Sequence, residues 1–178
     1  MLKKILLLLV AAIAGLAVYV AMQPDHFRIE RRATVNAPPQ AVFTQVNDFR
    51  KWDDWSPWAK LDPNSKIAFE GPQPGQGAVF KWSGNDKVGE GRMTLVESKP
   101  AELVRIEVAF VKPFEGSSTS EFIFRPRDGG TEVVWASYGP INFISKAMCL
   151  VMNMEKMLGP DMEMGLEQMK TLAESGRT

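Results

Sequence analysis

The sequence predicts an α+β fold in which a curved antiparallel sheet wraps around a long C-terminal helix, preceded by an N-terminal transmembrane helix. Three observations support this prediction. Residues 5–22 form an uncharged apolar run, and short segments of alternating apolar and polar residues follow one another as far as residue 138. After Pro140 the apolar spacing changes to three and four residues. A length of 178 residues suits one folded domain, expected over residues 25–178, behind an N-terminal segment of residues 1–24.

The N-terminal segment is long and apolar enough to cross a bilayer. Residues 5–22 comprise 18 residues without a charge, and as a helix they would span about 27 Å, close to the thickness of the hydrocarbon layer. A cleaved signal peptide is the alternative, with Ala12-Ile13-Ala14 as the cleavage site. The apolar run continues for eight residues beyond that site, so an uncleaved single-pass anchor fits the segment better.

The charges on either side of this segment bear on its orientation. Lys3 and Lys4 precede it, whereas Arg28, Arg31 and Arg32 follow it. Basic residues tend to stay on the inner side of a membrane, and a short basic N-terminus ahead of a first apolar segment usually remains inside. We therefore expect the domain on the outer side, which in a bacterium is the periplasm.

The first elements expected in the domain are a strand and a short helix. Residues 27–35 alternate between apolar and polar and predict a strand. Residues 36–39 form a turn that starts a helix, with Asn36 or Ala37 as its cap and a proline in its first turn. Residues 51–64 are expected to form a loop, which carries three tryptophans.

Six strand-like segments follow, each bounded by glycine, proline or asparagine. They cover residues 65–69, 78–83, 89–98, 103–111, 117–125 and 131–138. Their apolar residues occupy alternate positions, so the sheet is predicted to have one buried face and one wetter face. Such a sheet needs a cover, and the remaining large apolar element is the C-terminal helix.

The C-terminal helix is predicted from an apolar stripe that runs from Phe143 to about Glu174. Gly159-Pro160 interrupts this stripe, and proline removes a helix hydrogen bond, so a break or kink is expected there. Seven of the ten methionines lie between Met148 and Met169. Because methionine is flexible and polarizable, a wall rich in it can repack around varied apolar ligands.

Five short segments, taken with the order of the elements, carry a resemblance to a known family. They are Ala37-Pro38-Pro39-Gln40-Ala41-Val42-Phe43, Trp52-Asp53-Asp54-Trp55-Ser56-Pro57-Trp58, Lys81-Trp82-Ser83-Gly84-Asn85, Val88-Gly89-Glu90-Gly91-Arg92-Met93-Thr94 and the run from Pro160 to Leu166. Residues 27–174 resemble the START-like (SRPBCC) superfamily, and more closely its polyketide cyclase/dehydrase branch. The resemblance implies the helix-grip fold. The superfamily includes lipid carriers, hormone binders, cyclases and co-chaperone-like modules, so fold alone does not settle function.

The resemblance also implies an apolar cavity between the sheet and the long helix. The candidate lining consists of Trp58, Phe69, Phe80, Trp82, Met93, Phe110, Phe124 and Trp135 from the loop and strands, and Met148, Val151, Met152 and Met154 from the helix. A filled core is the competing interpretation. In the loop, Trp52 and Trp55 are expected to plug one end of the sheet. For Trp58 two roles stay open, a structural plug or a lid over the mouth of the cavity.

Two residues are weak candidates for catalysis. Glu97 shares the alternation of Met93 and Leu95 and is expected to point inward near a strand end, and Tyr138 ends the last strand. A cyclase or dehydratase needs a general acid or base of this kind inside its pocket. No pair of such residues has a spacing that requires catalysis, so enzymatic activity stays open and its absence is favoured.

Charge and composition exclude several classes of function. The 21 basic residues balance 21 acidic residues, and without Lys3 and Lys4 the remainder is slightly acidic, which argues against nucleic acid as a partner. The single histidine, His26, and the single cysteine, Cys149, exclude a two-histidine metal site, a cysteine-rich metal site and an internal disulfide. No metal and no cofactor are expected.

The predicted function is therefore membrane-anchored binding of a hydrophobic small molecule or lipid. An anchor at residues 5–22 would hold such a binder beside the membrane, where apolar ligands are found. A polyketide cyclase or dehydratase is one alternative. The other is a protein-interaction module with a filled core, and protein partners stay unassigned.

Overall fold

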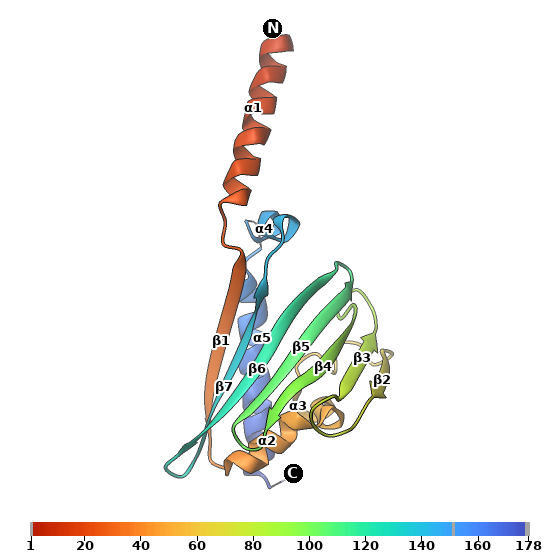
Figure 1. The fold of residues 1–178 in the computed structure, drawn as a ribbon, viewed down its shortest axis with the longest axis vertical. Helices are drawn as coiled ribbons and strands as arrows, with labels where there is room; N and C mark the ends of the chain where they lie inside the picture. Colours follow the sequence, from red (N-terminus) through yellow and green to blue (C-terminus); the bar gives the residue numbers. More distant parts are fainter. Residues whose placement is uncertain (1, 151, 177–178) are drawn as a thin grey trace.

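The N-terminal helix extends away from the rest of the chain (Figure 1). The computed structural model describes residues 2–150 and 152–176. Helix α1 (Leu2–Ala21) buries only Val20 and exposes its leucines, isoleucines and other large apolar side chains. By length and composition it can cross a membrane, which suits either an anchor or a signal sequence.

The remaining chain is built on one antiparallel sheet of seven strands, in the order β1-β7-β6-β5-β4-β3-β2. The strands are β1 (His26–Val35), β2 (Lys66–Glu70), β3 (Val79–Ser83), β4 (Glu90–Lys99), β5 (Leu103–Lys112), β6 (Gly116–Arg127) and β7 (Gly130–Pro140). All seven predicted strands are confirmed, with ends that differ by one or two residues. Strands β2 to β7 form a meander, and β1 pairs with β7, so the first and last strands lie side by side.

Five helices follow α1 and accompany the sheet. They are α2 (Pro39–Asn47), the 3-10 helix η1 (Phe49–Lys51), α3 (Trp52–Trp55), α4 (Phe143–Cys149) and α5 (Met154–Glu174). Helix α5 runs along β1 behind the sheet (Figure 1) and buries Met162, Leu166 and Met169. This arrangement of curved sheet and C-terminal helix is the helix-grip fold expected from the sequence.

The C-terminal helix is interrupted in a different place from the one predicted. Gly159-Pro160 lies inside α5, and the interruption falls between α4 and α5. There Asn153 caps the new helix, since its side chain accepts a hydrogen bond from the Lys156 N–H at 3.1 Å. The expected break at Gly159-Pro160 is therefore wrong.

Arg31 of β1 explains the glycine at this point of α5. A Cβ on Gly159 would lie 2.1 Å from an Arg31 guanidinium nitrogen, so any larger residue there would displace the arginine from its present path across the helix. Arg31 pairs with Glu155 and Glu163, each at 2.6 Å. These carboxylates stand one turn before and one turn after Gly159, so the arginine links the turns on both sides of the helix hydrogen bond that Pro160 cannot make.

The start of α2 also differs from the prediction. Pro38 occupies the N-cap position without a side-chain hydrogen bond, so neither Asn36 nor Ala37 caps the helix. The Asn36 N–H instead donates to the Glu174 carboxylate at 2.7 Å. This bond ties the turn after β1 to the last turn of α5.

The tryptophan segment begins as helix rather than as loop, because η1 and α3 occupy residues 49–55. Trp52 and Trp55 are buried, and their indole N–H groups donate to the Val46 and Gln45 carbonyls at 3.0 Å. Their ring centroids lie 4.7 Å apart, and both rings pack edge-on against Phe122. Both tryptophans, which were expected to plug one end of the sheet, are thus packed within the core.

Candidate functional site

A row of aromatic side chains lies on the concave face of the sheet, on the half away from α5. Strand register places Phe69 opposite Phe80, and places Gly91 between Trp82 and Phe110. Ring centroids are 5.5 Å apart for Phe69 and Phe80, 6.1 Å for Phe80 and Trp82, and 5.8 Å for Trp82 and Phe110. We call Phe69, Phe80, Trp82 and Phe110 the aromatic strip.

The aromatic strip is only partly covered. Phe69 is 44% exposed and Phe110 is 42% exposed, while Phe80 and Trp82 are half-buried. Ile67, 48% exposed, pairs with Trp82 and so extends the same face. The prediction omitted Ile67, although its spacing of two from Phe69 was the signal that could have included it.

Glycine at position 91 sets the orientation of Trp82. A Cβ there would lie 2.5 Å from the indole ring and 2.6 Å from the Ala109 carbonyl oxygen, so the ring lies against the bare backbone. The Trp82 indole N–H donates to the Val88 carbonyl at 2.9 Å. Because that hydrogen bond satisfies its polar atom, Trp82 presents apolar ring surface to the concave side.

Asp62 fastens the segment after α3 to the turn between β3 and β4. Its carboxylate accepts hydrogen bonds from the backbone N–H groups of Asn85 at 2.7 Å and Asn64 at 3.0 Å. These bonds, the one from Asn85 first, hold the pKa of Asp62 below its ordinary value. The turn that carries the Trp82 partner Val88 is thereby held in place.

Phe124 and Trp135 belong to the filled part of the core. Both are 2% exposed, and Trp135 stacks on Phe122 with a centroid distance of 4.8 Å. The Trp135 indole N–H donates to the Ser120 hydroxyl at 2.8 Å. Helix α5 packs directly on this ring, because a Cβ on Gly165 would lie 2.9 Å from it.

Trp58 and Met93 lie at the edge of the filled core, and Met93 stands opposite Phe80 of the strip. The Trp58 indole N–H donates to the Asp161 carboxylate of α5 at 3.2 Å, and its ring packs edge-on against Trp135. Met93 is half-buried and packs against the core. Trp58 thus connects the segment after α3 to the long helix, while its ring stays half-buried.

The expected methionine wall is not formed by the long helix alone. Met148 is half-buried on α4, Met152 is 40% exposed between α4 and α5, and only Met154 stands at the start of α5, where it packs against the core. Val151 lies outside the described residues. The wall is divided because the helix is interrupted before Asn153 rather than at Gly159-Pro160.

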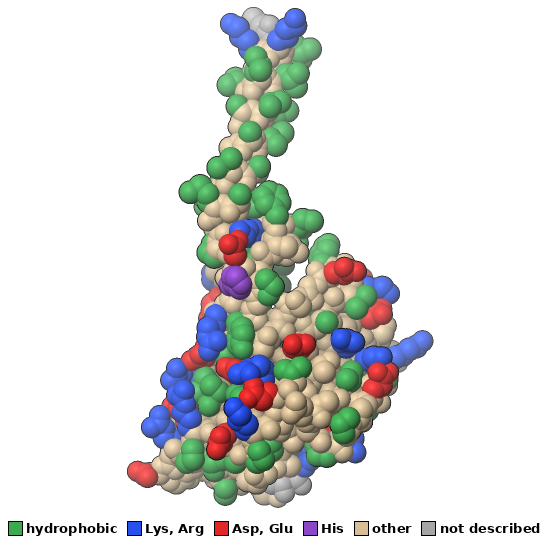
Figure 2. All heavy atoms as spheres, in the orientation of Figure 1, with side chains coloured by type: hydrophobic (Ala, Val, Ile, Leu, Met, Phe, Trp, Pro, Cys, Tyr) green, Lys and Arg blue, Asp and Glu red, His purple; other side chains and the backbone are tan. Residues whose placement is uncertain are grey.

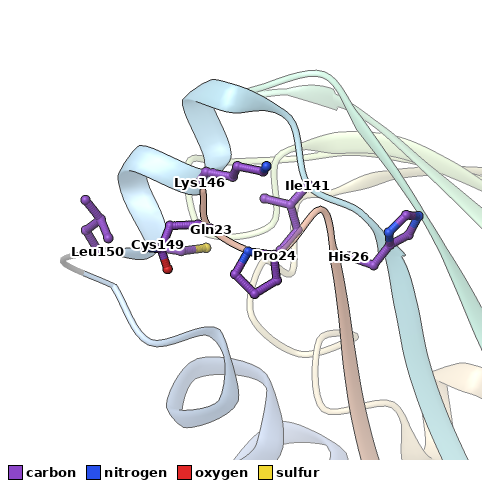
Figure 3. A pocket seen from close by; sticks show the side chains of 7 residues that line it. All are labelled: Gln23, Pro24, His26, Ile141, Lys146, Cys149 and Leu150. Atoms are coloured by element: carbon purple, nitrogen blue, oxygen red, sulfur yellow. The ribbon is translucent and has the colours of Figure 1, made fainter. Parts of the chain in front are cut away.

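A cavity of about 200 Å³ lies between the end of α1 and α4 (Figure 3). Its lining consists of Gln23, Pro24, His26, Ile141, Lys146, Cys149 and Leu150. Ligand pockets for drug-sized molecules usually measure about 300 to 1,000 Å³. This cavity is therefore too small for a lipid, and its lining residues differ from those predicted to line a ligand site.

The expected inward orientation of Glu97 is wrong. A β-bulge between Leu95 and Glu97 shifts the alternation, so Glu97 stands opposite Arg105 on the convex face. Its carboxylate bonds Lys99 at 2.8 Å and also pairs with Arg105. The hydrogen bond from Lys99 and the charge of Arg105 hold the pKa of Glu97 below its ordinary value.

Tyr138 joins the same convex face, over which acidic and basic side chains are interspersed (Figure 2). Its hydroxyl donates to Glu121 at 3.4 Å, and the Arg28 guanidinium lies 5.2 Å from the ring centroid. Arg105 bonds Glu121 at 2.8 Å, so Tyr138 and Glu97 are connected through one network of charges. The two catalytic candidates therefore lie together, on the face opposite the aromatic strip.

Within residues 2–150 and 152–176, no group of three or more histidine, cysteine, aspartate or glutamate side chains is arranged to hold a metal ion.

A family model described as polyketide cyclase / dehydrase and lipid transport matches residues 26–174. The chain belongs to this family. The match covers every strand and α5, so it includes the whole sheet and its long helix. No curated protein matches the sequence.

Solved structures share this fold at low sequence identity. A protein of unknown function from Staphylococcus aureus, SA2116, has a TM-score of 0.64 at 13% identity, with 85% of this chain and 96% of that chain covered. Aha1 from Colwellia psychrerythraea has a TM-score of 0.61 at 16% identity, with coverage of 85% and 99%. Identities this low indicate a shared fold alone.

A protein from a biosynthetic pathway is among the similar structures as well. The di-domain ARO/CYC StfQ from the steffimycin biosynthetic pathway has a TM-score of 0.63 at 14% identity. The alignment covers 85% of this chain and 51% of StfQ, so the family domain here resembles about half of that protein.

Proposed function

We propose that the protein binds a hydrophobic small molecule or lipid on the concave face, against the aromatic strip. One observation carries this proposal. Four aromatic rings in continuous contact are left partly open to solvent, although such rings normally contribute strongly to a core. Exposed apolar surface gathered in one place is typical of a binding site. The family description, which includes lipid transport, supports the same class of ligand.

The two halves of the concave face, one filled beneath α5 and one open at the aromatic strip, would have different roles. Trp55, Phe122 and Trp135 fill the half beneath α5 and stabilise the fold. Phe69 and Phe110 remain accessible in the other half and would be covered by a ligand. The core is thus filled in one half only, and the open half offers a continuous apolar surface to a ligand.

A cyclase or dehydratase receives no comparable support from the geometry. Glu97 and Tyr138, the two residues considered for proton transfer, face away from the strip. A carboxyl group whose pKa lies below its ordinary value is also a weaker base near neutral pH. We therefore do not propose an enzymatic reaction.

The proposed binding test uses the full chain in lipid nanodiscs with a diazirine-bearing fatty acid as probe. Light-induced adducts are expected on peptides from residues 66–83 and 103–112, and unlabelled fatty acid should compete. Phe69→Ser is expected to weaken binding about tenfold, because much of a phenyl contact is lost. Ala68→Ser is the matched control, since Ala68 is exposed on the same strand and faces the other side.

Two results would contradict ligand binding at the strip. One is labelling that unlabelled fatty acid does not reduce, and the other is equal labelling of the Phe69→Ser and Ala68→Ser variants. 1-Anilinonaphthalene-8-sulfonate, tested in parallel, separates a preference for aromatic ligands from one for acyl chains.

We further propose that residues 1–24 remain as an anchor and hold residues 25–178 on the outer side of the membrane. The apolar, almost fully exposed α1 supports this arrangement, as do Lys3 and Lys4 ahead of it. In a bacterial host, the full chain should stay in carbonate-washed membranes at its uncleaved mass, and protease should digest it in spheroplasts. A shorter soluble product would instead identify a signal sequence.

A further inference from the structure

Helix α4 is fixed against the last turn of α1. Val20, the one buried residue of α1, lies at this junction, where α1 and α4 are in contact. The Lys146 ammonium donates to the Ala21 carbonyl at 3.4 Å and pairs with Asp25. The carbonyl groups in the last turn of a helix lack hydrogen-bond donors within that helix, and Lys146 provides a donor for the Ala21 carbonyl. Helix α4 therefore stands at the level where α1 ends.

The distribution of side chains on α4 is the reverse of that on an ordinary surface helix. Its single charged residue, Lys146, is buried, whereas Phe143 is 52% exposed and Ile144 is 67% exposed. Leu150 and Met152 continue the exposed apolar surface after the helix. A helix in water normally turns its charged side outward and its apolar side toward the core.

The connection between β5 and β6 lies at the same end of the molecule. Figure 1 shows this connection, together with α4, at the end from which α1 projects. Val111 is 49% exposed there and Phe114 is 63% exposed. The start of β6 lies against the end of β7 here, because the Gly139 backbone packs against Ser117.

The opposite end of the sheet has a different character. The turn between β6 and β7 contains Asp128, and the turn between β4 and β5 contains Glu102, both exposed. Exposed apolar side chains thus gather on α4 and at Phe114, at the end next to α1, where Glu115 of the β5–β6 connection is exposed as well. The two turns at the far end expose charged side chains.

We infer that α4 and the β5–β6 connection dock into the headgroup layer of the bilayer that α1 crosses. This inference rests on the anchor in the proposed function, and the bilayer is the occupant because α4 is joined to the last turn of the spanning helix. Apolar side chains on an interfacial helix are stabilised at the boundary of headgroups and acyl chains. Phe110 of the aromatic strip lies next to Val111, so the docked end places the strip beside the lipid.

The test measures the depth of single sites in the full chain reconstituted in phosphatidylcholine vesicles. In a Cys149→Ser background, Ile144→Cys and Phe114→Cys carry the environment-sensitive label NBD. Asp128→Cys at the far end is the control. Emission at positions 144 and 114 should shift to the blue, and headgroup-proximal nitroxide lipids should quench it at least threefold more than at position 128.

Equal, weak quenching at all three positions in chains that still float with the vesicles would overturn docking and leave the anchor intact. Chains that do not float with vesicles would overturn both. Strong quenching at positions 144 and 114, without fatty-acid labelling of the strip, would support docking and contradict the ligand proposal alone. Circular dichroism of each labelled variant, compared with the native chain, identifies any variant that fails to fold.

The double variant Ile144→Asp with Phe114→Asp provides a second readout. It carries its label at Met152→Cys, and docking requires that the quenching of this label is lost.

Discussion

Asp62 shows how one carboxylate can hold two distant segments together. It joins the segment after α3 to the turn between β3 and β4 through the N–H groups of Asn64 and Asn85. Trp82 depends on the same turn, because its indole N–H donates to Val88. A single residue outside the aromatic strip thus contributes to the orientation of a ring within it.

The lowered pKa of Asp62 predicts a pH dependence of stability. Because its folded-state pKa lies below the unfolded value of about 4, its stabilisation is complete above pH 4 and is lost as the pH falls through the lowered pKa. Asp62→Asn should therefore unfold at lower temperature at pH 7, and the difference from the native chain should shrink toward pH 2. Thermal unfolding across this range checks the prediction, and parallel curves for the two proteins would contradict it.

At the scale of elements, the strands were predictable and the irregularities between them were not. Alternation is a local pattern, so it located all seven strands and placed Phe69, Phe80, Trp82 and Phe110 on one face. The bulge before Glu97 adds one residue to β4 without any local mark in the sequence, and it reversed the expected direction of that side chain.

The interruption of the C-terminal helix has a similar explanation. Proline and glycine suggested Gly159-Pro160 as its place, but the tertiary contacts of Arg31 keep α5 continuous there. Such contacts join residues more than a hundred positions apart, so no local pattern contains them. Which half of the sheet stays open was equally hidden, since it depends on where α5 begins and which strands it covers.

Arg31 gives a testable role to one contact between elements. Arg31→Ala removes the link between Glu155 and Glu163, so we expect faster amide hydrogen exchange over residues 155–163 with little change in the exchange of the β-sheet. Arg32→Ala is the control, because Arg32 pairs only with Glu30 among the described residues. Mass spectrometry of exchange in the full chain measures both, and identical exchange in the two variants would contradict the role.

At the scale of the whole molecule, the aromatic core connects the two halves of the concave face. Ring contacts lead from Phe80 through Phe49 and Trp52 to Trp55, and from there to Trp135 beneath α5. The open strip is thus continuous with the buried core. Rigid packing of that core supports the strip from below.

Trp55 is the most central member of this core and is fully buried. Trp55→Ala should lower the free energy of unfolding by about 3–5 kcal/mol, because it leaves a large cavity and removes the indole hydrogen bond to Gln45. Trp58→Ala should cost clearly less, since that ring is half-buried. Urea unfolding of both variants tests this order, and equal losses would contradict it.

The attachment of Lys146 to both Ala21 and Asp25 affects how the molecule searches its surroundings. A free linker after α1 would let the domain swing through all directions, and each encounter would need a favourable orientation. The lysine contacts stiffen this joint, so an anchored molecule keeps one facing direction while it diffuses in the membrane plane. Encounters of an anchored molecule would then be a two-dimensional search with a preset orientation, and charge-removing substitution of Lys146 should loosen this joint.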